Sequence, residues 1–209
     1  MKTRMTKAMA GMMALIMALA MAGCGSSDDS GSKGGSEKSA ASGIHYEQQA
    51  LSNEFFSYQL EIDGDVITLP IQKAELESLG FEIEESDRIV DGASLGHAER
   101  DGIRLSTYSA GDMIFELDLS GPDCKGLEGH EVKISGGFTL YKDNYDTVLA
   151  AAEAAGGNKG GSYGDEYRLK DHPGSFIRLY NNGTPSDVAA SVFISNKFAL
   201  DDEHKELLK

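Results

Sequence analysis

Residues 103–119 read IRLSTYSAGDMIFELDL, and within this stretch two apolar-rich runs flank a short turn. Ile103–Tyr108 and Met113–Leu119 place apolar side chains at alternate positions, a pattern that predicts two half-buried strands. The segment between them, Ser109–Asp112, contains Gly111, which suits a tight reversal of the chain. We therefore expect an antiparallel pair of strands in the middle of the sequence.

The chain before this pair predicts a strand hairpin and then a short helix. Apolar and polar residues alternate over 56–62, Asp63-Gly64 is a turn signal, and a second strand follows over 66–69. A helix is predicted over 70–80, because proline suits a first turn and glycine a helix end. Its inner face is expected to hold Ala74, Leu76 and Leu79. We expect a loop between this helix and the central pair, and within it Arg88-Ile89-Val90 is a candidate short strand.

The chain after the pair repeats this order. Val132–Ile134 predicts a short strand, which Gly136-Gly137 interrupts. Asp143 can cap a following helix, whose buried stripe is expected at Tyr145, Val148, Leu149 and Ala152. Gly156-Gly157 ends this helix. Three more strands are expected, near Tyr167–Leu169, Ser175–Tyr180 and Val188–Ser195.

Both halves thus read as strand, helix and then two or three antiparallel strands. This order predicts an α+β fold with helices packed on one face of an antiparallel sheet. We predict two tandem related units, at 44–126 and 127–209. The charged C-terminal stretch, Asp201–Lys209, predicts a frayed end or a short helix.

Two short motifs carry a family resemblance. Leu69-Pro70 before a helix ending in Leu79-Gly80-Phe81 resembles a motif of uncharacterised lipoproteins from monoderm gut bacteria, and Gly136-Gly137-Phe138-Thr139-Leu140 resembles their second unit. These units are similar to the small α+β fold of β-lactamase-inhibitor proteins and BamE-like envelope lipoproteins, over roughly residues 55–195. The resemblance implies binding of other proteins through the sheet face, with no catalytic residues to carry over.

The N-terminus has the features of a lipoprotein leader. A basic segment precedes an apolar stretch over 8–22, which is too short for a transmembrane helix of about 20 apolar residues. Met21-Ala22-Gly23-Cys24 resembles the bacterial lipobox, although methionine stands where leucine is usual. We expect a signal peptide over 1–23 and lipidation (palmitate) of Cys24, which holds the protein to the cell membrane on its extracytoplasmic side. An ordinary secretory signal is the alternative.

Composition limits the remaining classes of function. Residues 24–43 are rich in Gly and Ser and predict a disordered tether after the lipidated cysteine. The chain has a net charge of −15 and no basic cluster, which argues against nucleic-acid binding. Two cysteines are too few for a disulfide scaffold or a Cys-rich zinc module. The 40% apolar content is enough for a packed core.

Two strings suggest nucleophilic chemistry, and each has a structural explanation. Gly92-Ala93-Ser94-Leu95-Gly96 matches the G-x-S-x-G nucleophile elbow, which needs a strand before it and a helix after it. The next strand follows too soon for that helix, so we interpret the string as a glycine-rich loop. Cys124 precedes His130 by six residues, and such a pair is nucleophilic only if the fold brings the two together. We expect a structural or intermolecular role for this thiol.

Metal and phosphate sites are not predicted. The five histidines (His45, His97, His130, His172 and His204) are scattered, which argues against zinc. Asp63-Gly64-Asp65 and Asp143–Asp146 do not follow a calcium-loop order, and turns and caps explain them. Residues 156–161 lack the Lys-Ser/Thr of a phosphate loop, so we expect a flexible connection there and no cofactor.

A group of aromatic residues is the candidate binding face. Tyr163, Tyr167, Phe176 and Tyr180 are candidates for one face of a sheet, where aromatics anchor interfaces if exposed and form core if buried. The function we predict is a non-enzymatic, membrane-anchored module that binds another envelope or extracellular protein. The alternative is a lipoprotein that binds a small solute or wall glycan, and a hydrolase using Ser94 or Cys124 is a third class.

Lipid anchoring is directly testable. Cys24→Ala removes the only thiol that the lipobox pattern allows to be acylated, so the protein should be released into the medium. Fractionating cells and medium measures the change. Retention of the variant in the membrane fraction would contradict the predicted anchor.

Overall fold

The structure is a computed structural model that describes residues 49–119, 127, 129–161, 164–181 and 190–209. Contacts group the chain into two units, Met1–Ala41 and Ser42–Lys209. The described residues all belong to the second of these units. The signal peptide, Cys24, the tether, Cys124 and Tyr163 lie outside the described residues.

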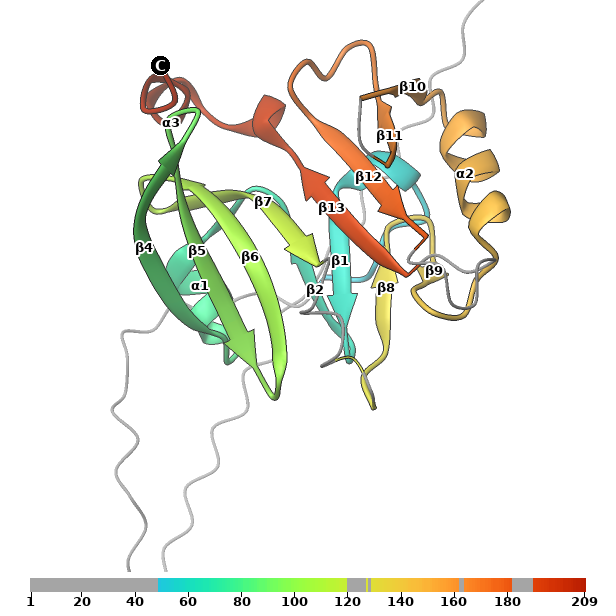
Figure 1. Cartoon of the computed structure of the whole chain (residues 1–209), viewed down its shortest axis with the longest axis horizontal. Helices are drawn as coiled ribbons and strands as arrows, with labels where there is room; N and C mark the ends of the chain where they lie inside the picture. The colour runs from blue at the N-terminus through green and yellow to red at the C-terminus, as the bar shows by residue number, and fades with distance from the viewer. Residues whose placement is uncertain (1–48, 120–126, 128, 162–163, 182–189) are drawn as a thin grey trace, which may run out of the picture. The chain divides into compact units, whose positions relative to one another are not determined.

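The larger of two antiparallel sheets has the strand order β10-β11-β12-β13-β7-β6-β5-β4, with β3 paired to β7 beside this path (Figure 1). Antiparallel pairing joins every neighbouring pair of strands, and β7 meets β13 in the middle. The strands are β3 (Ile71–Gln72), β4 (Glu82–Val90), β5 (Ala93–Arg100), β6 (Ile103–Ala110), β7 (Met113–Leu119), β10 (Asn158–Gly160), β11 (Asp165–Arg168), β12 (Phe176–Tyr180) and β13 (Ser191–Ser195).

The smaller sheet has the order β2-β1-β8-β9. Its strands are β1 (Gln59–Ile62), β2 (Asp65–Thr68), β8 (Val132–Ile134) and β9 (Phe138–Thr139). Short 3₁₀ helices span Phe55–Ser57 and Lys197–Ala199. The α-helices are α1 (Lys73–Ser78), α2 (Tyr145–Ala154) and α3 (Asp202–Glu206).

Each half of the unit contributes strands to both sheets. β1-β2 and β8-β9 are two hairpins of the small sheet, joined by the pairing of Glu61 with Lys133 and its neighbours. β4–β7 and β10–β13 are two four-stranded meanders of the large sheet, joined between β7 and β13. One α-helix stands before each meander. Each of the two sheets therefore contains strands from both halves of the unit.

One core cluster fills the space under the large sheet. Alternate residues of its strands, such as Leu105 and Ile177, are fully buried there. The same cluster contains Leu76 of α1, Val148 of α2 and Leu60 of β1. Since all these side chains meet in one cluster, α1, α2 and the small sheet lie on the same side of the large sheet. We call that side the inner face and the opposite side the outer face.

The C-terminal segment covers part of the outer face. Leu200 packs in a second, smaller cluster with Ala93, Ala110 and Phe115, and Leu208 packs against it. The imidazole of His204 bonds Asp201 at its own helix and Asp112 in the β6–β7 turn, at 2.7 and 3.0 Å. Both bonds raise the pKa of His204, and the bond to Asp112 has the larger effect. The bond to Asp112 also attaches α3 to the β6–β7 turn.

Several sequence-based predictions need correction. The loop predicted between the first helix and the central pair is instead the β4–β5 hairpin, and the candidate strand Arg88–Val90 is the end of β4. The string Gly92–Gly96, interpreted as a loop, is one turn residue followed by the start of β5. Asp91-Gly92 and Asp101-Gly102 adopt positive φ at both residues, as two-residue hairpin turns require. Proline does not begin α1, which starts at Lys73, after β3.

Other boundaries also differ. Asn144, not Asp143, is the N-cap of α2: its side chain accepts a bond from the Thr147 backbone, whereas Asp143 accepts one from the Thr139 backbone at 2.6 Å. Residues 158–160, predicted as a flexible connection, form the edge strand β10. The α+β class and the antiparallel sheet are confirmed, although the helices are few and short.

A core substitution tests the inner face. Ile177 is fully buried in the core cluster, so Ile177→Ala should lower the free energy of unfolding by about 2–5 kcal/mol. Ile89 has a relative exposure of 69%, so Ile89→Ala should change it by no more than about 0.5 kcal/mol. Urea unfolding measures the free energy of unfolding of both variants and of the native protein. Equal losses would contradict the placement of Ile177 in the core and of Ile89 on the surface.

Candidate functional site

A row of paired residues crosses the outer face of the large sheet. Each member lies directly opposite the next on the neighbouring strand, so the side chains lie side by side on one face. From β11 to β4 the row is Glu166, Arg178, Phe193, Asp118, Ser106, His97 and Glu84. This face differs from the apolar inner face because five of its seven row members are ionisable.

Aromatic rings and one guanidinium group form a cluster in the middle of this face. Phe193 of β13 stacks on Tyr108 of β6 with ring centroids 5.6 Å apart, and it meets Phe176 of β12 edge-on at 5.1 Å. The Arg178 guanidinium lies 5.0 and 5.3 Å from the Phe176 and Phe193 rings. We call Tyr108, Phe176, Arg178 and Phe193 the aromatic–arginine cluster.

A buried carboxylate fixes the orientation of Arg178. Glu166 is fully buried, and it accepts bonds from Arg178 Nε at 3.0 Å and from Arg168 Nε at 2.6 Å. Arg178 also donates to the Tyr180 hydroxyl at 3.3 Å. Charge-assisted bonds of this kind are stronger and more directional than neutral ones. The guanidinium is therefore held in place over the rings before any partner arrives.

Glu116 is a half-buried titratable group beside the cluster. It lies opposite Tyr108 of β6 and Ser195 of β13, and Ser195 Oγ donates to its Oε1 at 2.9 Å. Burial raises the pKa of Glu116 to about 7. Burial also raises the pKa of Tyr108, so its hydroxyl stays neutral under physiological conditions. The Glu116 carboxyl is therefore protonated as the pH falls through about 7, and the centre of the outer face then carries one negative charge fewer.

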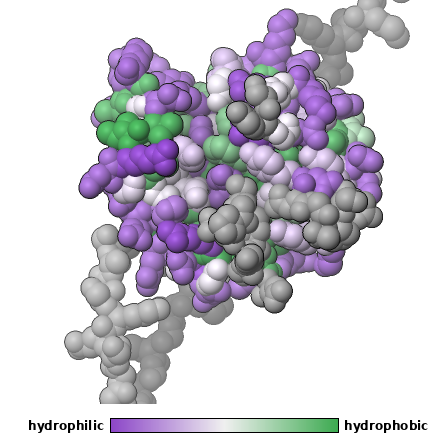
Figure 2. Space-filling model, viewed as in Figure 1, coloured by the Kyte–Doolittle hydropathy of each residue, from purple (hydrophilic) through white to green (hydrophobic). Residues whose placement is uncertain are grey.

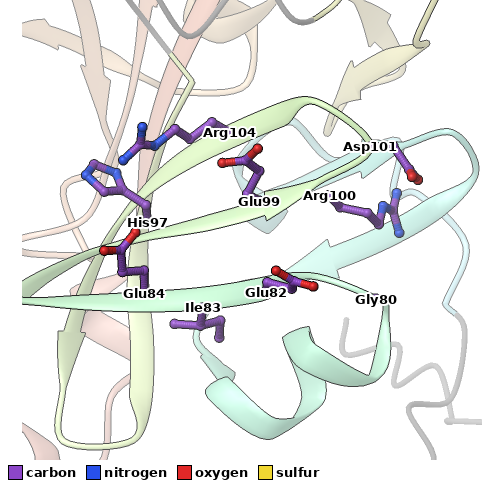
Figure 3. A pocket seen from close by; sticks show the side chains of 9 residues that line it. All are labelled: Gly80, Glu82, Ile83, Glu84, His97, Glu99, Arg100, Asp101 and Arg104. Atoms are coloured by element: carbon purple, nitrogen blue, oxygen red, sulfur yellow. The ribbon is translucent and has the colours of Figure 1, made fainter. Parts of the chain in front are cut away.

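A groove of about 500 Å³ lies at the β4 end of the outer face (Figure 3). Strands β4, β5 and β6 supply most of its polar side chains, and Figure 3 shows His97 and Arg104 next to each other above Glu84. Within the part of the chain that the structure describes, the buried atoms His97 Nδ1 and Arg104 Nε have no hydrogen-bond partner. The lining residues are Gly80, Glu82, Ile83, Glu84, His97, Glu99, Arg100, Asp101 and Arg104.

A second hollow of about 500 Å³ is more apolar. It lies between the 3₁₀ helix at Phe55–Ser57, α2 and the segments after β8 and β11. Phe56, Phe138 and Leu169 line it, and His172 stands at its margin. The face shown in Figure 2 is mostly hydrophilic, with a hydrophobic area at its upper left.

The structure divides the predicted aromatic face between the two sides of the sheet. Tyr167 is buried on the inner face, where its hydroxyl donates to Glu153 at 3.2 Å. Phe176 and Tyr180 lie on the outer face, because they alternate with the buried Ile177 and Leu179. Tyr163 lies outside the described residues. Only two of the four therefore share a face in the described part of the chain.

The predicted nucleophiles are not placed in a catalytic setting. Ser94 lies within β5, opposite Ser109 of β6 and Ile89 of β4, so no helix follows it as an elbow requires. His130 Nδ1 is bonded to Asp63 at 2.6 Å, which raises its pKa, and Cys124 lies outside the described residues. Among the described residues, no group of three or more His, Cys, Asp or Glu side chains is placed to hold a metal ion.

Sequence reasoning missed the residues that complete the site. Tyr108, Glu116 and Phe193 stood within predicted strands, but only strand register shows that they meet. Glu84, His97 and Glu99 stood in the predicted loop. Two signals were present: the Asp-Gly pairs at 91–92 and 101–102, which are strong hairpin markers.

Comparisons of the chain with protein-family models, with curated proteins and with solved structures find no match. The resemblance to envelope lipoproteins and to β-lactamase-inhibitor proteins therefore stays a prediction from short motifs. Within the described residues, no helix is long and apolar enough to span a membrane.

The raised pKa of Glu116 predicts a pH-dependent stability. The folded state binds more protons than the unfolded state between the ordinary value of 4.5 and about 7, so the free energy of unfolding should fall as pH rises through that window. The full effect is roughly 3 kcal/mol. Glu116→Gln keeps an acceptor for Ser195 and carries no charge. It should therefore be more stable than the native protein at about pH 8 and similar at about pH 4.

Urea unfolding across this pH range measures the effect, with Glu77→Gln on the exposed side of α1 as the control. A constant difference between Glu116→Gln and the native protein at all pH values would contradict burial of this carboxyl.

Proposed function

We propose that this protein is a lipid-anchored, extracytoplasmic and non-catalytic module that binds another envelope or extracellular protein through the outer face of its large sheet. The single observation that supports this proposal most directly is the aromatic–arginine cluster in the middle of that face. Tyr and Arg are among the residues that contribute most to protein–protein binding, and they do so near the centre of interfaces.

The arrangement of the cluster suits a protein partner. Tyr108 and Phe193 are half-buried, so their rings are positioned by neighbours and still reach the surface. Arg178 is fixed by the buried Glu166. Side chains that are already ordered lose little conformational entropy on binding, which favours affinity.

The tandem arrangement is part of the same proposal. Each predicted unit, 44–126 and 127–209, supplies one hairpin and one four-stranded meander. The aromatic–arginine cluster forms where the two meanders meet, since Tyr108 comes from the first and Phe193 from the second. A binding face at the junction of two related units is consistent with the resemblance to protein-binding envelope lipoproteins.

The membrane anchor and the acidic charge fit this role. A lipid on Cys24 and a tether over 24–43 would hold the folded unit near other envelope proteins, which raises its effective concentration for them. The net charge of −15 favours partners with basic surfaces and disfavours nucleic acids.

Binding of a small solute or a wall glycan is the second candidate. The apolar hollow lined by Phe56, Phe138 and Leu169 supports it, because about 500 Å³ is within the range of small-molecule sites. A solute seated there should protect α2 from hydrogen exchange. A partner seated on the outer face should instead protect β6 and β13.

Affinity capture with the tagged full chain from its solubilised native envelope tests the proposed function. Native protein should retain one partner in near-equal amounts. Tyr108→Ala and Phe193→Ala should each weaken retention by roughly 30-fold, as loss of a central anchor of about 2 kcal/mol requires.

Phe198→Ala is the matched control. Phe198 is an aromatic residue with 42% exposure that stacks on His172, outside the aromatic–arginine cluster. The Phe198→Ala variant should therefore retain the partner as well as the native protein does. Equal capture by the native protein and both cluster variants, with folding verified by urea unfolding, would contradict binding through this face.

A further inference from the structure

Strand β4 leaves one edge of the large sheet open. Among the described residues, it is the last strand on its side of the sheet and pairs only with β5 (Figure 1). In the described part of the chain, the backbone of 82–90 bonds otherwise only through the Arg88 amide to Ser86 Oγ. An open edge of this kind presents free N–H and C=O groups to which another extended segment can add.

The regular part of this edge is short and well defined. Residues 82–85 pair in register with 96–99, and the register then shifts between Glu85 and Ile89. A bulge of this kind twists the edge and ends regular pairing. The segment available for strand addition is therefore Glu82–Glu85, which lies along the groove at the β4 end of the outer face.

Like charges lie opposite each other beside this edge. Glu82 of β4 is directly across from Glu99 of β5, and both side chains are exposed. Like charges in directly opposite positions destabilise a sheet. A cation between the two carboxylates would remove that repulsion.

The groove carries more negative than positive charge. Its four carboxylates, on Glu82, Glu84, Glu99 and Asp101, form no ion pair among the described residues. Of its two guanidinium groups, Arg100 is already bonded to Asp65 at 2.6 Å and to the Leu79 carbonyl at 2.7 Å. Among the described residues that line the groove, Arg104 is the one remaining guanidinium group, and it lies on the neighbouring strand β6, opposite Glu99.

We propose that the groove beside β4 receives a basic side chain of an extended partner segment, and that the backbone of this segment adds to the edge at Glu82–Glu85. The occupant is a stretch of another protein with lysine or arginine at alternate positions. Alternation results from strand geometry, because every second side chain of an added strand points to the outer face. This inference rests on the proposed function and names the chemistry of the partner.

The same charges exclude a second copy of this chain. Two β4 edges would bring Glu82 and Glu84 against their equivalents, and like charges at an edge block pairing. The β4 edge is therefore not expected to pair with the β4 edge of a second copy or with an acidic strand. It is open to basic ones, which gives selectivity through repulsion as well as attraction.

The test uses the full-length protein in an uncharged detergent and a short synthetic peptide that alternates threonine and lysine. At physiological salt, this peptide should bind and should slow hydrogen exchange in β4. Glu82→Gln combined with Glu99→Gln should weaken binding about tenfold. Both side chains are exposed, so the fold should tolerate the change.

Two controls separate the site from general charge attraction. Asp146→Asn combined with Glu203→Gln removes two exposed carboxylates elsewhere and should change binding by less than about twofold. The same peptide N-methylated at alternate backbone nitrogens should bind at least about tenfold more weakly, because it cannot pair along the strand.

Three results would overturn the inference. One is equal weakening by the two double variants, another is equal binding of the N-methylated peptide, and the third is equal binding of a threonine–glutamate peptide. Partner capture separates this inference from the proposed function. If the Glu82/Glu99 variant retains the partner while Phe193→Ala loses it, the outer face binds a protein but not through the β4 edge.

Discussion

The central strands of the large sheet must each bury one face, and that requirement organises the folded unit. Leu105 of β6, Ile177 of β12, Leu76 of α1 and Val148 of α2 all meet in one core cluster. Burial of such side chains is the main favourable contribution to folding. The inner face is therefore fixed by packing, and the outer face is where polar and aromatic residues are free to serve a partner.

The outer face is more ordered than an ordinary solvated surface. Its row of paired residues includes a fully buried carboxylate, Glu166, that holds Arg178 over two aromatic rings. Glu116 lies half-buried close by, and desolvation raises its pKa to about 7. A buried charge is costly unless it is bonded, so the cluster around Arg178 is a structured feature that the core alone does not require. This is the physical basis for placing function there.

Local patterns predicted the elements that are half-buried. The alternation in 103–119 predicted β6 and β7 correctly, and the apolar stripe through Tyr145 and Val148 predicted α2. The β4–β5 hairpin was missed because β4 is exposed along almost its whole length and so has no apolar alternation. The turns on either side of β5, at Asp91-Gly92 and Asp101-Gly102, carried the only strong local signal. The residues of the candidate site were harder still to predict from the sequence. Tyr167 and Phe176 differ in face because of strand register, and the meeting of Tyr108 with Phe193 depends on the pairing of β7 with β13.

The most direct measurement of the central claim is site-specific photo-cross-linking in native cells. A photoreactive residue at position 193 lies within the aromatic–arginine cluster, whereas one at Tyr141, with 41% exposure, lies between β9 and α2. Binding through the outer face predicts one discrete protein adduct from position 193 and none from position 141. An adduct from position 141 alone, or no protein adduct from position 193, would contradict the account.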